Sequence, residues 1–96
     1  MEHARAGLQK IVADVLRRAP PEEAPLLAWP LACGPAVAAK TRPLAFREGV
    51  LHVQVPDPAW REQLLELAPR YLAALNQAIG VTVARIEFVV PDPRKT

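Results

Sequence analysis

Several residue types that carry chemistry in proteins are scarce in this sequence. Its 96 residues include no serine, one cysteine, two histidines and four glycines. The single cysteine, Cys33, excludes a disulfide within the chain, and its apolar neighbours indicate a structural side chain rather than a nucleophile. The two histidines lack the spacing of metal ligands, and the glycines are too dispersed for a phosphate-binding loop. We therefore expect no enzyme activity, no metal, no cofactor and no small-molecule substrate.

Long hydrophobic runs are absent as well. No apolar stretch approaches the roughly 20 residues that a transmembrane helix needs, and the N-terminal residues do not show a basic segment followed by an apolar one. We expect a cytoplasmic protein that does not contact membranes. The net charge of +2 and the pI of about 9.1 are mildly basic, below the excess that is typical of tight nucleic-acid binders.

The residues that are present have the balance of a folded domain. Hydrophobic residues make up 51% and charged residues 23% of the chain, and the length fits one domain. We predict a single domain over residues 1–90. The remaining residues, 91–96, are polar and contain prolines, so we expect them to form a mobile tail.

The first part of the chain has helical periodicity. One apolar stripe predicts a helix over residues 4–19, which Pro20 and Pro21 would end. The stripe consists of Leu8, Ile11, Val12, Val15, Leu16 and Ala19. Residues 22–40 are rich in alanine and leucine and predict a second helix, broken where Pro35 follows Gly34. Its inward-facing residues are expected to be Trp29, Val37 and Ala38.

From residue 43 onward the apolar residues alternate. Residues 43–46 and 51–55 predict a β-hairpin with a turn at Glu48 and Gly49, where Gly49 can adopt positive φ. Residues 81–90 predict a last strand. One face of it would carry Ala84, Ile86, Phe88 and Val90. The other, half-apolar face would carry Val83, Arg85, Glu87 and Val89.

A third helix is predicted between the hairpin and the last strand. Asp57 followed by Pro58 is a strong start signal, because the carboxylate caps free amides and proline fits the first helical position. Gly80 is the expected C-terminal cap, and Pro69 is expected to bend the helix. The apolar stripe consists of Trp60, Leu64, Leu67, Tyr71, Leu72, Leu75 and Ile79.

These elements occur in the order α-α-β-β-α-β. Three strands with helices on one face predict an α+β two-layer sandwich with a three-stranded sheet. Within it, Asp57 is explained as a helix cap rather than a general base. His52 alternates with inward-facing strand residues, so we expect it to face solvent rather than to bind a ligand.

Two kinds of residue are candidates for binding partners. Trp29 and Trp60 are large enough to be core residues or interface anchors, and Trp60 could remain partly exposed beside the hairpin end as a docking residue. The cations Lys40, Arg42 and Arg47 surround the start of the hairpin, and further arginines lie elsewhere in the sequence: Arg17, Arg18 and Arg85. Such groups form solvated surfaces more often than nucleic-acid sites, so nucleic-acid binding is expected to be weak and salt-sensitive.

An ordered combination of short motifs resembles the DciA family. It covers nearly the whole chain from Leu8 to Val90 and is most specific in the two tryptophans around the Gly-Pro break and in the Thr-Arg-Pro start of the hairpin. The motifs are Trp29-Pro30, Gly34-Pro35, Val37-Ala38, Thr41-Arg42-Pro43, Gly49-Val50-Leu51, Val53-Gln54-Val55, Pro58-Ala59-Trp60, Leu64, Leu67-Ala68-Pro69, Leu75-Asn76 and Ile86-Glu87-Phe88.

The resemblance implies a domain similar to the KH fold that acts in bacterial DNA replication. It implies binding to the DnaB-type hexameric helicase and assistance in loading this helicase onto single-stranded DNA, without ATPase activity. The residues that match the family pattern are Trp29, Gly34, Thr41, Pro43, Gly49, Trp60 and Leu64. Among them Trp60, Leu64 and Trp29 are the expected partner contacts, with Trp60 first.

The sequence departs from the family pattern in two places. Lys40 stands where members often have histidine, and many members carry a long basic extension where this chain has only residues 91–96. A GxxG loop is also missing, which disfavours KH-type recognition of RNA.

Two alternative functions remain open from the sequence. The first is a stand-alone, weak single-stranded nucleic-acid-binding domain that uses Lys40, Arg42 and Arg47 together with Arg17 and Arg18 of the first helix. The second is an interaction or oligomerisation domain, suggested by the half-apolar face and the open edge of the last strand.

Overall fold

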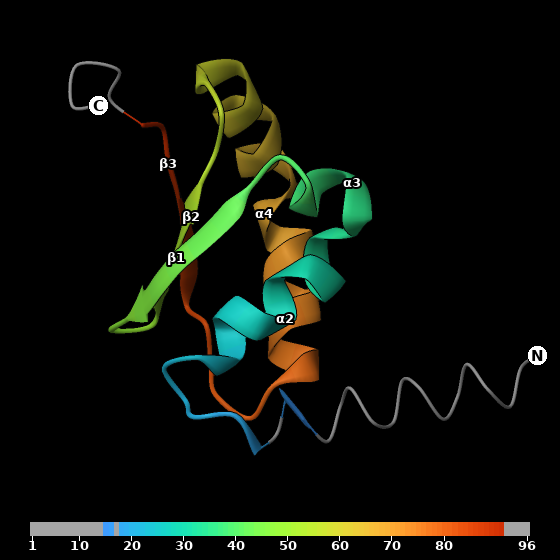
Figure 1. Cartoon of the computed structure of the whole chain (residues 1–96), viewed down its shortest axis with the longest axis vertical. Helices are drawn as coiled ribbons and strands as arrows, with labels where there is room; N and C mark the ends of the chain where they lie inside the picture. Colours follow the sequence, from blue (N-terminus) through green and yellow to red (C-terminus); the bar gives the residue numbers. More distant parts are fainter. Residues whose placement is uncertain (1–14, 17, 92–96) are drawn as a thin grey trace, which may run out of the picture.

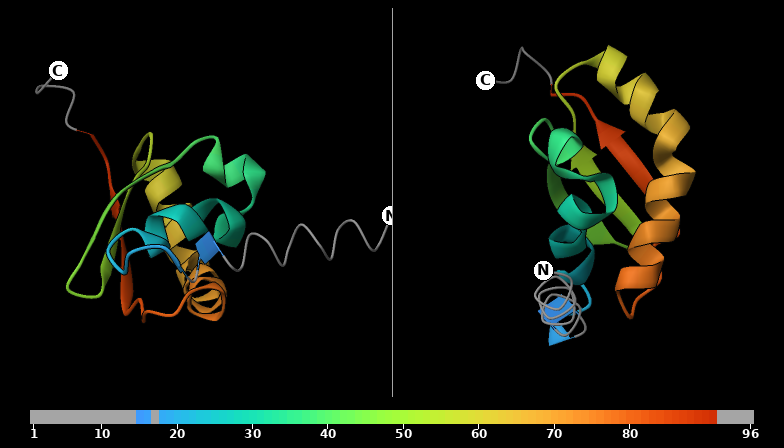
Figure 2. Two further views of the ribbon diagram at one scale, coloured as in Figure 1. Left: turned by 60° about the horizontal axis from the view of Figure 1, so that its bottom comes forward. Right: turned by 90° about the vertical axis from the view of Figure 1, so that its right-hand side faces the viewer.

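The protein is a three-stranded mixed sheet with helices on one face. Its computed structural model describes residues 15, 16 and 18–91. The elements are α2 (Ala24–Cys33), α3 (Pro35–Ala38), β1 (Arg42–Arg47), β2 (Val50–Gln54), α4 (Pro58–Ala78) and β3 (Arg85–Val89). β2 is the central strand, antiparallel to β1 and parallel to β3. All three helices lie on the same side of the sheet (Figures 1 and 2). The predicted α+β order and layers are confirmed.

The core lies between the sheet and the helices. Leu51 and Val53 of β2 and Ile86 and Phe88 of β3 are buried beneath α2 and α4. The Trp29 ring of α2 meets the Tyr71 ring of α4 edge-on, with centroids 5.4 Å apart. Burial of each such aliphatic or aromatic side chain stabilises the fold by roughly 1.5–3 kcal/mol. The central position of Trp29 joins both helices to the sheet.

The predicted break in the second helix occurs where expected. Gly34 has a φ of 85°, a conformation that a residue with a Cβ rarely adopts. Pro35 follows as the first residue of α3, where its missing N–H costs no hydrogen bond. Trp29 is buried, and Val37 and Ala38 are half-buried. The helix break therefore turns the chain toward β1 without interrupting the core.

The hairpin is confirmed, with one irregularity in β1. The turn residues Glu48 and Gly49 have φ values of 51° and 79°, which suit a tight turn between antiparallel strands. The register of β1 against β2 shifts between Pro43 and Ala45. Leu44 is therefore the extra residue of a bulge and remains exposed.

Helix α4 begins where the sequence predicted, but its apolar stripe and its C-terminal end differ from the prediction. Asp57 caps it, since its Oδ1 accepts the Trp60 N–H at 2.9 Å. Leu67 is 38% exposed, because the buried positions Leu64, Tyr71 and Leu75 place Leu67 off their face. The prediction that Leu67 belongs to the apolar stripe was wrong.

The C-terminal cap of α4 is also not the glycine that the sequence indicated. The capping residue is Ile79, in extended conformation with a φ of −126°, and its side chain is buried. Gly80 does not have positive φ. Because the Ile79 side chain is buried, the backbone leaves the helix in an extended conformation. A glycine with positive φ is therefore not needed at this end of α4.

The last strand is shorter than predicted. β3 begins only at Arg85, and Val83 is buried whereas Ala84 is exposed, which reverses the expected faces at these two positions. Residues 81–84 form a loop because the Asn76 side chain bonds both backbone groups of Val83. Of the predicted half-apolar face, only Val89 remains as an apolar residue that is not buried.

The predicted first helix lies mostly outside the described residues. Val15 and Leu16 are helical, and Leu16 is buried in the core. Val15 is 56% exposed, so its predicted place on the apolar stripe was wrong. Arg17, a predicted nucleic-acid contact, lies outside the described residues.

Candidate interaction surfaces

Two of the three predicted partner contacts are core residues. The Trp29 side chain is 0% exposed and Leu64 is 2% exposed, so in this conformation neither offers surface to a partner. Burial is the physical reason for correcting their role: both positions lie where helices α2 and α4 meet the sheet. Trp60 is the candidate contact that remains at the surface.

Trp29 has a polar function inside the fold. Its indole Nε1–H donates to Thr41 Oγ1 at 2.9 Å, and this hydroxyl in turn donates to the Val37 carbonyl at 2.8 Å. A buried indole N–H needs such an acceptor. These two hydrogen bonds link α2 to α3 through Thr41 and thereby fix the position at which β1 starts. They explain why Trp29, Val37 and Thr41 occur together in the sequence.

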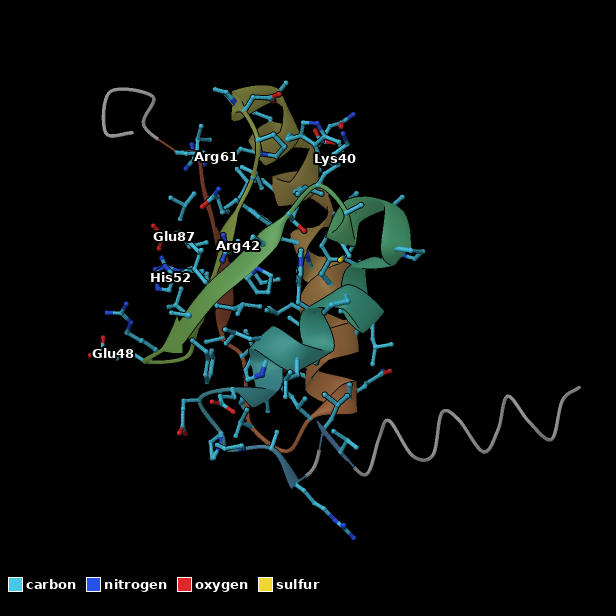
Figure 3. All side chains as sticks on the ribbon, in the orientation of Figure 1. Lys40, Arg42, Glu48, His52, Arg61 and Glu87 are labelled. Atoms are coloured by element: carbon cyan, nitrogen blue, oxygen red, sulfur yellow. The ribbon has the colours of Figure 1, made fainter. Side chains whose placement is uncertain are left out.

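Trp60 lies half-buried in a groove on the first turns of α4. The groove measures about 430 Å³ and is lined by Asp57, Ala59, Trp60, Glu62, Gln63 and Glu66. One side of the indole packs against the core, and the rest borders three carboxylates. α4 begins just after β2, at the end of the sheet opposite the Glu48 turn (Figures 1 and 3).

A second surface is the face of the sheet that the helices leave open. Strand register places Arg42 beside Gln54 and Val89, Ala45 beside His52 and Glu87, and Arg47 beside Val50 and Arg85. These rows alternate with the buried rows through Leu51 and Val53, and so they face outward. Figure 3 shows His52 and Glu87 pointing away from the helices. Three arginines thus share one open face.

The charges of this face are arranged around one carboxylate. Glu87 Oε2 lies 3.5 Å from Arg85 Nη2 and 3.9 Å from His52 Nδ1. Both pairs are solvent-exposed, so each contributes less than about 1 kcal/mol to stability. With three arginines and one glutamate the face is net positive. The sequence placed Arg85 apart from Arg42 and Arg47, and the strand register brings it onto the same face.

The predicted basic cluster is only partly brought together. Arg42 and Arg47 stand at opposite ends of β1, roughly 16 Å apart at about 3.3 Å per residue, and do not both surround the hairpin start. Lys40 is exposed just before β1. Arg18 is exposed and precedes the start of α2 by six residues. The sheet face, not the first helix, unites Arg42 and Arg47.

Cys33 is a half-buried thiol at the end of α2. Burial raises the pKa of the Cys33 thiol to about 11, and the Sγ–H donates to the Gly34 carbonyl at 3.5 Å. The neutral thiol is therefore the dominant form at neutral pH. In the part of the chain that the structure describes, His, Cys, Asp and Glu side chains do not gather in threes as a metal site would need.

The helices of the described residues range in length from the 4 residues of α3 to the 21 residues of α4. None of these helices combines the length and the apolar character needed to cross a bilayer.

Comparison with known proteins identifies one family. The family model described as "Dna[CI] antecedent, DciA" matches residues 4–88 of the chain. No curated protein matches the sequence significantly. The matched range includes every described helix and strand except the last residue of β3.

Proposed function

This chain belongs to the DciA family of replication accessory proteins, and from that membership we propose that it binds a DnaB-type replicative helicase. In this proposal it assists loading of the helicase onto single-stranded DNA in the cytoplasm and does not hydrolyse ATP itself. The family match over residues 4–88 is the observation that carries the proposal. The protein acts by docking rather than by chemistry.

The docking site in this proposal is the Trp60 groove at the start of α4. A half-buried indole offers a large apolar contact that is already fixed in position, so little conformational entropy is lost on binding. Glu62 and Glu66 are exposed and line the same groove. The complementary helicase surface would present an apolar residue to the indole and a lysine or arginine to the carboxylates, with cation–π attraction to the ring.

Isothermal titration calorimetry with the replicative helicase of the same organism tests this site. We expect Trp60→Ala to weaken binding by at least about tenfold, the effect of an interface anchor worth more than 1.4 kcal/mol. Because Trp60 also touches the core, Glu62→Lys provides a second variant that changes only the exposed rim. Circular dichroism establishes that each variant is folded.

A matched charge reversal serves as the control. Glu22→Lys changes an exposed glutamate in the segment before α2, and this segment lies at the opposite end of the molecule from the first turn of α4 (Figure 1). Its affinity is expected to equal that of the unmodified chain. Equal affinity of all three variants would remove the Trp60 groove from the proposal, and absence of helicase binding by the unmodified chain would overturn the proposal itself.

A loading assay tests the second half of the proposal. Helicase unwinding of a forked DNA substrate is expected to start faster when this chain is present. ATP hydrolysis by the chain alone is expected to stay at background, and hydrolysis that persists in a highly purified preparation would contradict the non-enzymatic mechanism.

A weak single-stranded DNA contact is a second candidate function, favoured by the open sheet face. Arg42, Arg47 and Arg85 lie on this one face, and guanidinium groups bind phosphates well. Exposed aromatic side chains are not part of the face, so phosphate contacts rather than base stacking would provide the affinity. Lys40 is exposed just before β1 but lies toward the helical layer, away from His52 and Glu87 of this face (Figure 3).

Salt dependence tests this contact. Each lost phosphate contact lowers the slope of log affinity against log salt by roughly 0.7 for single strands, and we expect this decrease for Arg42→Ala and for Arg85→Ala. Arg70→Ala, an exposed position on α4, is the control. Binding that does not respond to salt, or a slope that Arg42→Ala and Arg85→Ala leave unchanged, would exclude the sheet face.

A further inference from the structure

Strand β3 is an edge of the sheet and keeps one side of its backbone unpaired. β2 is its neighbour on one side, and among the described residues no other strand pairs with it. The Val89 carbonyl accepts the Val55 N–H at 2.8 Å, and the Arg85 N–H donates to the Gly49 carbonyl at 3.2 Å. Backbone groups of odd-numbered β3 residues therefore face β2, and those of Ile86 and Phe88 face away from it.

Arg61 of α4 binds one of these outward-facing backbone groups. Its Nε donates to the Phe88 carbonyl at 3.1 Å, so this side chain of α4 reaches over the edge of β3. Three outward groups remain without a backbone partner among the described residues: the N–H and carbonyl of Ile86 and the N–H of Phe88. Unpaired edge groups of this kind accept an additional strand.

A groove runs along this edge, between β3 and the first half of α4. It measures about 340 Å³ and is lined by Arg61, Leu65, Arg85, Ile86, Glu87 and Phe88. Leu65 is 45% exposed and forms an apolar wall. Edge backbone groups beside a helix with an apolar wall are the elements that domains use to bind extended peptides by strand addition.

The charges of the groove select the kind of peptide. Within the described residues no carboxylate lies within ion-pair distance of Arg61, whereas Glu87 is already paired with Arg85 and His52. The Arg61 Nε donates to the Phe88 carbonyl, and the two terminal nitrogens of the guanidinium carry further donors. An acidic side chain on the incoming segment can pair with the Arg61 guanidinium, which presents several donors in a fixed plane.

We propose that this groove binds an extended segment of a partner protein as a fourth strand along β3, with an acidic side chain placed against Arg61. The face of the added strand that meets α4 carries an apolar side chain toward Leu65 and the acidic side chain toward Arg61, and the other face, toward solvent, carries polar side chains. A peptide fits better than a nucleic acid, since the free groups of Ile86 and Phe88 recur at the two-residue spacing of a strand.

This inference goes beyond helicase docking through Trp60. The two grooves share no lining residue, and the segment bound along β3 is not required to come from the helicase. A loss of helicase affinity in Trp60→Ala therefore says nothing against the β3 groove, and the proposal for each site is tested independently.

Nuclear magnetic resonance with a model peptide tests the groove. The probe is a capped peptide of about eight residues in which one strand face carries valine and aspartate and the other face carries threonine. We expect its titration into the isotope-labelled chain to shift the backbone amide signals of Ile86 and Phe88 and to slow their hydrogen exchange. The same peptide with every backbone nitrogen methylated is expected to leave both signals unchanged, because neither of its edges can donate to the ladder.

Arg61→Glu tests the charge selection on a position that is exposed and outside the core. We expect it to weaken binding of the aspartate peptide by roughly two- to fivefold, the range for an exposed ion pair, and to improve binding of a lysine-substituted peptide. Arg70→Glu makes the same change elsewhere on α4 and is expected to have no effect.

Three outcomes would overturn the proposal. The first is an absence of shifts at Ile86 and Phe88 at millimolar peptide, and the second is equal binding of the methylated peptide. The third is a shift of the same two signals that follows protein concentration without peptide, which would assign the edge to a second copy of the chain. Shifts caused at this edge by a single-stranded oligonucleotide instead of the peptide would assign it to nucleic acid.

Discussion

Asn76 and Val83 are joined by two hydrogen bonds: Asn76 Nδ2 donates to the Val83 carbonyl at 3.1 Å, and the Val83 N–H donates to Asn76 Oδ1 at 2.7 Å. The side chain of α4 thus replaces a neighbouring strand as the partner of the loop before β3. The bonds place the Val83 side chain in the core and set the point at which β3 begins.

Replacing Asn76 is expected to destabilise the protein. Asn76→Ala removes both bonds and leaves the half-buried backbone groups of Val83 without partners, at a cost of about 1–3 kcal/mol. Urea unfolding followed by circular dichroism measures the change. Gln77→Ala, at the exposed neighbouring position, serves as the control and is expected to shift the free energy of unfolding by less than about 0.5 kcal/mol. An equal loss of stability in both variants would show that the Asn76 hydrogen bonds do not stabilise the protein.

Thr41 is expected to stabilise the protein through Trp29. Thr41→Val keeps the shape of the side chain but leaves the buried indole N–H without an acceptor, and we expect a loss of about 1–3 kcal/mol. Thermal or urea unfolding checks the value, and tryptophan fluorescence reports on the indole environment. Thr82→Val makes the same exchange at an exposed position. If the two substitutions prove equally mild, the Trp29 bond does not contribute.

The hairpin turn offers a stabilising substitution. Glu48 has a φ of 51°, and a residue with a Cβ in this region costs about 1–2 kcal/mol unless it is asparagine, aspartate or glycine. We expect Glu48→Asn to raise the unfolding free energy by roughly 0.5–1 kcal/mol. Glu48→Ala removes the same charge but keeps the strained conformation, so it is the control; a gain of similar size in Glu48→Ala would point to charge rather than backbone strain.

The Cys33 thiol is expected to make stability depend on alkaline pH. Its pKa is raised from 9.0 to about 11 by burial. The folded chain therefore keeps a proton that the unfolded chain loses, and stability falls as pH rises from about 9 toward 11. Tyr71, whose pKa burial also raises, acts in the same direction, so a variant is needed to separate the two.

Cys33→Ala provides this separation. Unfolding midpoints measured across the alkaline range are expected to fall less steeply in the variant than in the unmodified chain. Alkylation of Cys33 by iodoacetamide near neutral pH is expected to be much slower than that of a free cysteine, because the thiolate is the nucleophile. Alkylation at the rate of a free thiol would contradict the raised pKa.

Local signals in the sequence predicted the element order well. Asp57 with Pro58, Gly34 with Pro35 and Gly49 each act through backbone groups within a few residues, so their effect can be inferred from neighbours alone. The failures at Val83 and Gly80 have a common cause, because a bond from Asn76 and the burial of Ile79 come from tertiary packing. Propensity arguments do not include such contacts.

The candidate surfaces were less predictable than the fold. Motif matching indicated Trp29 and Leu64 together with Trp60, but the pattern cannot separate residues that shape the core from residues that contact partners. Arg85 joins Arg42 and Arg47 only through strand register, and Arg61 reaches Phe88 only after α4 folds back over β3. Both relationships connect residues on different elements that are 27 or more positions apart, so no local signal was available.

The position of β3 in the chain has a consequence for protein synthesis. β3 is the last of the described strands, and Ile86 and Phe88 complete the core beneath Trp29. A nascent chain that has emerged from the ribosome only as far as α4 has the hairpin and helices but leaves that side of β2 unpaired. Such an intermediate exposes apolar surface and a free strand edge. The core is complete only after residue 89 has emerged, and a chaperone can bind the exposed surface until then.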